Sequence, residues 1–219
     1  MSFTWLSHII DNETPLYGGR KDGIRIDPNK SMAAGDSCNT STITMPAHAG
    51  THVDAPRHFV ENGQSVDAFS PETWVFRSPW VINLDAAPGQ LIEPMELDID
   101  NIPIETDICL FKTSFKQHRQ SDMYWQNGPG IAPSVADVLV TRCPDLRAVG
   151  MDFISISSLA AREIGRAAHR SFLGKEMLII EDMKLSDLAP DDELTQIVCL
   201  PLRISAGDGA PCTILGTLQ

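Results

Sequence analysis

The sequence predicts an α/β fold with a mixed sheet core and few helices. Short apolar runs rich in branched residues recur along the chain, while only two segments have a helical pattern. No internal repeat, low-complexity tract or Gly/Ser linker interrupts the chain, so residues 1–219 are expected to form one domain. With 219 residues and 42% hydrophobic content, the chain can bury a large core.

Six apolar runs have the length and composition of strands. Branched and aromatic side chains favour the extended conformation, and turn-forming residues separate the runs. The predicted strands cover residues 41–45, 80–84, 108–112, 148–151, 177–180 and 197–201.

Two helices are expected in the C-terminal half of the chain. The clearer one covers residues 158–172, with Ser158 as its N-cap. Its apolar stripe would consist of Leu159, Ile164, Ala167 and Ala168. The second covers residues 134–142 and ends before Pro144, which cannot continue a helix.

Charge and composition favour small-molecule chemistry. The net charge of −12 repels a phosphate backbone and no basic stripe is present, so we expect no nucleic-acid partner. No apolar stretch approaches the length of a membrane span, and the N-terminus lacks a signal-peptide pattern, so a cytoplasmic protein without membrane contact is expected. The five scattered cysteines indicate neither a disulfide framework nor a thiolate zinc site.

The segment that carries chemistry is His48-Ala-Gly-Thr-His52-Val-Asp54-Ala-Pro-Arg-His58. It contains three of the six histidines and a carboxylate within eleven residues. Imidazole and carboxylate ligands together suit Zn or Mn, and the absence of cysteine favours a catalytic site over a closed structural one. The residues therefore predict a metal-dependent hydrolase.

The spacing of this segment requires the chain to turn. On a straight strand His48 and His52 would lie about 13 Å apart, too far for one metal ion. Gly50 permits an unusual backbone angle, and a helical turn would bring residues four apart to about 6 Å. We expect the strand over 41–45 to deliver this turn to the rim of a pocket, with Asp54 and His58 following on irregular backbone.

The pattern His-x-Gly-Thr-His-x-Asp-x-Pro-x-His-Phe, complete from His48 to Phe59, resembles the cyclase-like metal hydrolases that include bacterial kynurenine formamidase and isatin hydrolase. Further matches to this family are Leu6-Ser7-His8, Thr14-Pro15, Gly150-Met-Asp152 with Ser155, His169, Glu181, and the closing turn Gly207-Asp208-Gly209-Ala210-Pro211. The resemblance spans most of the chain.

The resemblance implies a swivelling β/β/α domain, a homodimer or higher homo-oligomer, and one or two divalent metal ions, with Zn as the first candidate and Mn as the second. One ion would be bound by His48, His52 and Asp54. Asp54, His169 and Glu181 would bind the other. His58 would be the catalytic acid/base.

The resemblance also implies an arylformamidase-like reaction, in which metal-activated water converts N-formylkynurenine to kynurenine and formate. Tyr17-Gly18-Gly19 and Ser155-Ile156-Ser157 depart from the formamidase pattern, so the substrate stays open. Isatin-type ring opening and lactone or cyclic ester hydrolysis need the same activated water. A metal-dependent cyclase or dehydratase and a non-catalytic metal-binding protein are further alternatives.

Overall fold

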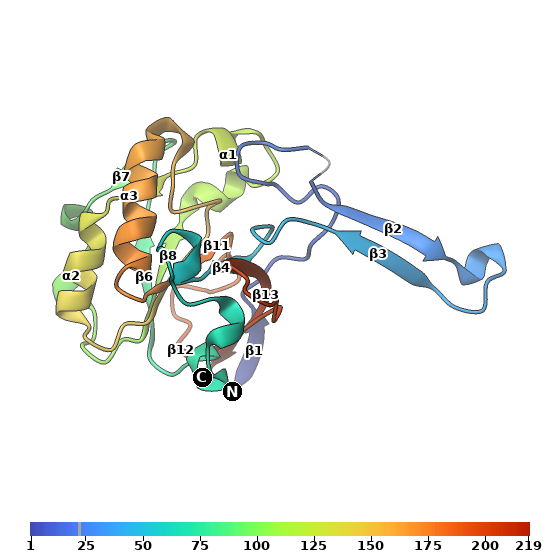
Figure 1. The fold of residues 1–219 in the computed structure, drawn as a ribbon. Coiled ribbons are helices and arrows are strands. Elements are labelled where there is room, and N and C mark those ends of the chain that lie inside the picture. The colour runs from blue at the N-terminus through green and yellow to red at the C-terminus, as the bar shows by residue number, and fades with distance from the viewer. Residues whose placement is uncertain (22) are drawn as a thin grey trace.

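A nine-stranded mixed sheet forms the core of the computed structural model, which describes residues 1–21 and 23–219. The strand order is β5-β12-β13-β4-β11-β10-β8-β6, and β1 pairs with β13 beside this path. The predicted α/β fold with a mixed sheet and few helices is confirmed (Figure 1). Within the described part of the chain, no helix is long and apolar enough to span a membrane.

The elements of this sheet are β1 (Ser2–Trp5), β4 (His52–Asp54), β5 (Val75–Phe76), β6 (Pro79–Leu84), β8 (Ile108–Thr113), β10 (Ala148–Met151), β11 (Leu178–Glu181), β12 (Leu194–Pro201) and β13 (Gly209–Leu218). Two small sheets pair β2 (Arg25–Lys30) with β3 (Thr40–Thr44) and β7 (Leu91–Ile92) with β9 (Gly130–Ile131). The α-helices are α1 (Met123–Gln126), α2 (Ser134–Arg142) and α3 (Arg162–Leu173).

The sheet has a parallel half and an antiparallel half. β6, β8, β10 and β11 are parallel neighbours, and α3 lies between β10 and β11 in the chain because parallel strands need a crossover connection. β4 is antiparallel to both of its neighbours, β11 and β13. The three residues of β4 therefore lie at the boundary between the two halves, where three segments far apart in sequence meet.

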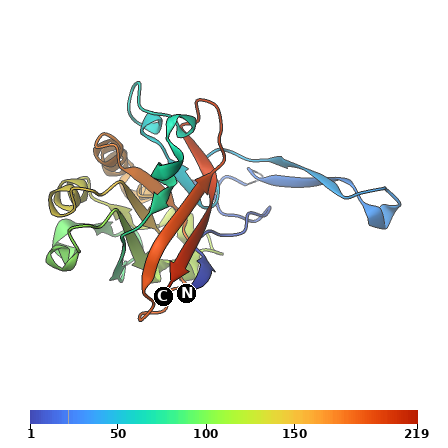
Figure 2. The ribbon, with the colours of Figure 1, turned by 90° about the horizontal axis from the view of Figure 1, so that it is seen from below.

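The two faces of the sheet bury different hydrophobic clusters. Helices α2 and α3 cover one face, where Leu139 and Phe172 join Phe111 of β8 (Figures 1 and 2). The other face contributes a second cluster that includes Val53 and Ile214. The sheet curls around this second cluster, since β12 also contacts β6.

The hairpin formed by β2 and β3 projects away from the rest of the molecule as an arm (Figures 1 and 2). The predicted strand over 41–45 is present as β3, which pairs with β2 and leads into the bends before β4. His48 and Gly50 of these bends line a cavity, as the prediction of a turn at a pocket rim requires. The side chains of β3 are exposed, including Ile43 at 57%. A two-stranded hairpin of this kind has little stability of its own in water.

Several strands were not predicted because their sequence signal is weak. β4 has only three residues, two of them polar, and β13 contains Pro211 and Gly216, which are uncommon inside strands. β1 and β2 were also missed. β10 and α2 match the predicted ranges, and the ends of β6, β8 and β11 lie within one residue of them. β12 begins three residues early, and α3 begins four residues late, at Arg162, after a 3₁₀ turn.

The predicted apolar stripe of α3 is partly wrong. Ile164 is 41% exposed, whereas Ala168 is buried as predicted. The buried positions of α3 are Gly165, Ala168, His169, Phe172 and Leu173. This spacing of i, i+3, i+4, i+7 and i+8 is one helix face, and it places a histidine among the residues that pack on the sheet.

The burial of α3 predicts unequal effects from two substitutions on the same helix. Phe172 is fully buried, so Phe172→Ala should lower the free energy of unfolding by about 3–5 kcal/mol in urea denaturation. Ile164→Ala should change it by less than about 0.5 kcal/mol. Equal losses for the two variants would contradict this packing of α3.

Candidate metal centre

Strand β4 places His52 and Asp54 on the same side of the sheet. Successive side chains of a strand point to opposite faces, so Val53 enters the second hydrophobic cluster while its two neighbours point the other way. Asp54 is 1% exposed and His52 is 5% exposed. Strand β4, which is buried between β11 and β13, therefore holds the ionisable side chains of His52 and Asp54 at a fixed distance from each other.

Glu181 joins this pair because β11 is the antiparallel neighbour of β4. Its register places Glu181 directly opposite His52, so the two side chains share one face. The Glu181 carboxylate is held from the far side by the Ser155 hydroxyl at 2.9 Å and the Ile156 N–H at 2.8 Å, both donating to Oε1. These bonds leave Oε2 directed towards β4.

His169 reaches the same point from helix α3. Its Nδ1 lies 2.8 Å from the Gly165 carbonyl, one turn earlier, and a carbonyl can only accept, so this nitrogen carries the proton. A Cβ on residue 165 would lie 1.8 Å from the Ser157 hydroxyl oxygen, so only glycine allows this close approach of the helix. His52 is oriented in the same way by the Gly50 carbonyl at 2.8 Å.

These four residues form what we call the four-donor centre: His52, Asp54, His169 and Glu181. The Nε2 atom of His52 lies 3.5 Å from Asp54 Oδ1 and 3.4 Å from Glu181 Oε2. The Nε2 atom of His169 lies 3.5 Å from Asp54 Oδ2 and 3.5 Å from Glu181 Oε1. Ligand atoms of His52, Asp54 and Glu181 lie within 4.8 Å of one another, and ligands about 2.1 Å from a tetrahedral ion are about 3.4 Å apart, so these three side chains can hold a divalent metal. His169 lies beside both carboxylates.

The electrostatics of the four-donor centre agree with this fit. Burial lowers the pKa of His169, but Asp54 and Glu181 outweigh it and raise this pKa to about 10. Burial also raises the pKa of Glu181, yet the two histidines bring it down to about 2. Two buried carboxylates therefore require about two positive charges beside them, which one divalent ion supplies while leaving both imidazoles neutral.

His48 and His58 lie beside this centre and share a third carboxylate. His48 Nδ1 is 2.7 Å from Asp54 Oδ1, and its Nε2 is 2.9 Å from Asp208 Oδ2. His58 Nδ1 is 3.1 Å from the same Asp208 oxygen, and its ring stacks on His48 at 4.1 Å. Burial lowers the pKa of His58, which favours a neutral imidazole near pH 7.

A buried ion pair fixes the backbone beside Glu181. The next residue, Asp182, has a φ of 50°, which is strained for a residue with a side chain. Arg119 donates two hydrogen bonds to its carboxylate, at 2.9 and 2.7 Å, and the Tyr124 hydroxyl donates a third at 2.6 Å. This network holds the end of β11 in place.

The structure thus brings all six predicted site residues together around Asp54. The expected helical turn from His48 to His52 is wrong: residues 47, 48, 50 and 51 are bends, and β4 begins at His52. The unusual backbone angle expected at Gly50 is present, with a φ of 59°. The resemblance assigns His52 to one metal ion and Glu181 to the other. In the structure the two side chains lie next to each other, with 3.4 Å between His52 Nε2 and Glu181 Oε2.

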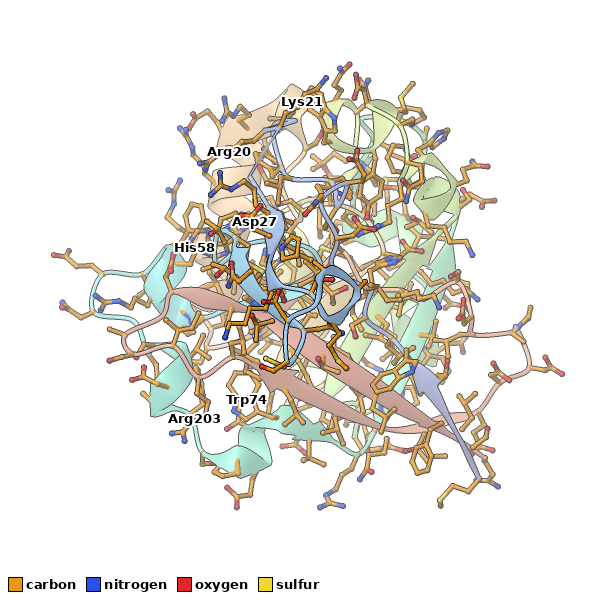
Figure 3. All side chains as sticks on the ribbon, turned by 90° about the vertical axis from the view of Figure 1, so that its right-hand side faces the viewer. Arg20, Lys21, Asp27, His58, Trp74 and Arg203 are labelled. Atoms are coloured by element: carbon orange, nitrogen blue, oxygen red, sulfur yellow. The ribbon has the colours of Figure 1, made fainter. Side chains whose placement is uncertain are left out.

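Other residues of the site were missed from the sequence. Asp208 lies in the loop before β13, 150 residues from His58, and no local pattern links the two. The four-donor centre opens into a cavity of about 320 Å³ whose other walls include Leu16, Tyr17, Phe59, Ile154, Arg162 and Arg166. His58 lies on the face from which the arm projects (Figure 3).

A comparison with known families matches residues 4–158 to the family described as putative cyclase. The chain belongs to this cyclase family. The predicted membership is therefore confirmed, over most of the chain and across the whole histidine segment.

Two relatives and one solved structure illustrate the similarity. Cyclase-like protein 2 of Oryza sativa subsp. japonica is 30% identical over 94% of this chain and 75% of its own length. Kynurenine formamidase of Bacillus thuringiensis subsp. konkukian is 29% identical over 80% of this chain and 78% of its own. Isatin hydrolase A from Ralstonia solanacearum shares the fold, with a TM-score of 0.79 and 20% identity over 98% of this chain and 91% of that one.

The Arg119–Asp182 pair predicts a large loss of stability when one partner is removed. Arg119→Met should lower the free energy of unfolding by about 3–5 kcal/mol, because it leaves a carboxylate that is 1% exposed without its cation. Lys184→Met is the control, since Lys184 pairs with the exposed Asp187 and should cost about 1 kcal/mol or less. If urea denaturation gives similar losses in the free energy of unfolding for both variants, Arg119 does not have this structural role.

Proposed function

We propose that this protein is a metal-dependent hydrolase that cleaves the amide C–N bond of a small molecule, with N-formylkynurenine as the first candidate substrate. The observation that carries the proposal is the four-donor centre beside His58 at the inner end of the cavity. Similarity to kynurenine formamidases supports the choice of a formamide.

A divalent ion bound by the four-donor centre would polarise a carbonyl and lower the pKa of a water molecule. His58 would move the proton. Its Nδ1–H donates to Asp208, which leaves Nε2 free to accept a proton from water and to return it to the departing nitrogen. The oxygen of that water would bond to the carbonyl carbon as its proton passes to His58. The C–N bond would then break to give formate and the free aromatic amine, while Asp208 keeps the imidazole in the required tautomer.

The second candidate is the ring opening of an isatin-type cyclic amide. The fold shared with isatin hydrolases supports this candidate, and hydrolysis of a cyclic amide breaks the same kind of bond. Nitrogen and oxygen donors in the centre admit Zn first and Mn second, and two ions are possible only if His48 exchanges its hydrogen bond to Asp54 for a ligand bond.

The decisive experiment combines metal analysis with formate release from N-formylkynurenine. We expect bound divalent metal, loss of formate release after chelation, and recovery when Zn or Mn is restored. His58→Ala should retain metal while kcat falls by about 10²-fold or more, and His118→Ala, outside the cavity, should match the wild type.

Each outcome of this experiment has a separate meaning. Protein that cannot be loaded with metal would refute the metal centre. Loaded protein that hydrolyses isatin but not the formamide would make the second candidate the function. Full activity in His58→Ala would assign proton transfer to another group.

We also propose that residues 1–219 act as one domain and that the protein works in the cytoplasm on a small-molecule substrate. Pairing of β1 with β13 supports the single domain, because it ties the first strand of the chain to the last. The negative net charge and the modest cavity support a small substrate over a nucleic acid.

A homodimer is the assembly that we propose for the protein. A groove of about 700 Å³ lies at the base of the arm and is lined by apolar side chains that include Trp5, Met45 and Leu200. Trp5 and Leu200 are each 59% exposed, and an apolar patch of this kind usually marks an interface. A two-fold axis near the groove would cover both patches and support each arm against the partner copy.

The dimer can be tested through the groove. Leu200→Glu should convert a dimer into a monomer in light scattering, because it places a charge in the apolar contact. Met95→Glu, at a residue that is 91% exposed and outside the groove, should leave the assembly unchanged. A wild-type monomer, or a Leu200→Glu dimer of unaltered affinity, would exclude this interface.

A further inference from the structure

Two arginines of helix α3 lie along the same side of the cavity as His169. Arg162, Arg166 and His169 follow the spacing i, i+4 and i+7, and all three line the cavity. At about 1.5 Å per residue, Arg166 lies about 4.5 Å and Arg162 about 10.5 Å before His169 along the helix axis. One helix therefore carries a proposed metal ligand at one end of the cavity and two cations towards the other.

The wall between these ends is apolar and aromatic. Leu16, Tyr17, Phe59 and Ile154 contribute to it, and the Phe59 ring stacks on His169 with 4.4 Å between centroids. A cavity of about 320 Å³ accommodates a molecule with one aromatic ring. The ring of such a molecule would lie between the four-donor centre and the arginines.

The charges are distributed unevenly along the cavity. Both of its carboxylates, Asp54 and Glu181, lie at the inner end, where histidines surround them. Among the described residues, the ion pair of Arg166 is with Glu163 of its own helix. The Glu163 side chain is 80% exposed, and such surface pairs exchange readily for other carboxylates. For Arg162 no ion pair occurs among residues 1–21 and 23–219. The protein has a net charge of −12, so two arginines that line the same cavity indicate a functional role for their positive charge.

We infer that Arg162 and Arg166 form an anion subsite that binds a carboxylate of the substrate. The inference rests on the proposed amide hydrolysis and narrows its substrate class to aromatic amides that carry a carboxylate. Guanidinium groups bind carboxylates through two parallel hydrogen bonds, and the N-terminal end of α3 adds a favourable partial charge. The subsite fixes the substrate so that its amide faces the four-donor centre and His58.

The test compares two amides that differ only in the carboxylate: para-formamidobenzoate and formanilide. The wild type should have the higher kcat/KM for the anionic amide. Arg162→Met and Arg166→Met should each reduce the ratio of the two kcat/KM values by about tenfold or more, mainly through KM. Arg170→Met is the matched control on the same helix, exposed and outside the cavity, and should leave the ratio at the wild-type value.

A binding measurement separates this inference from the proposed reaction. Calorimetry of para-formamidobenzoate with metal-loaded His58→Ala protein should show binding that weakens about tenfold when Arg162→Met is added and not when Arg170→Met is added. If binding depends on Arg162 in this way but the wild type does not hydrolyse the amide, the anion subsite is supported and the proposed hydrolase activity is refuted. Binding or rate ratios that change equally in Arg162→Met, Arg166→Met and Arg170→Met would overturn the subsite, as would a wild type without preference for the anion.

Discussion

The structure depends on the burial of two carboxylates, Asp54 and Glu181, on adjacent strands. Placing two negative charges side by side without water is costly unless cations and hydrogen bonds surround them. Imidazoles approach from β4 and α3, and the Ser155 hydroxyl with its neighbouring N–H approaches from the loop after β10. The fold brings these imidazoles and hydrogen-bond donors together around the two carboxylates.

The scaffold fixes that point through backbone rather than through side chains alone. The register of β4 against β11 sets the position of Glu181 relative to His52, and backbone carbonyls set the tautomers of His52 and His169. The buried Arg119–Asp182 pair then holds the strained residue that follows Glu181. A preorganised donor set of this kind binds an ion without having to reorganise first.

The cavity combines three environments along one helix. Its lining includes the carboxylates of Asp54 and Glu181, the aromatic rings of Tyr17 and Phe59, and the guanidinium groups of Arg162 and Arg166. The arm projects from the face on which His58 is seen (Figure 3).

The sequence by itself determined the family and the mixed α/β class, and it predicted six site residues that the structure brings together. The eleven residues from His48 to His58 hold so much chemistry at fixed spacing that their function could be read locally. Central strands such as β8 and β10 could be predicted for a similar reason, since strands buried on both faces are continuously apolar.

Only the tertiary structure decided how these residues meet. β4 is a strand because β11 and β13 pair with it on both sides, although its own three residues carry no strand signal. His169 faces the centre because it belongs to the buried face of α3 that packs on the sheet. Asp208 reaches His58 across 150 residues of chain. Pairing, helix phase and contacts between distant segments depend on packing partners, which a local pattern of residues does not contain.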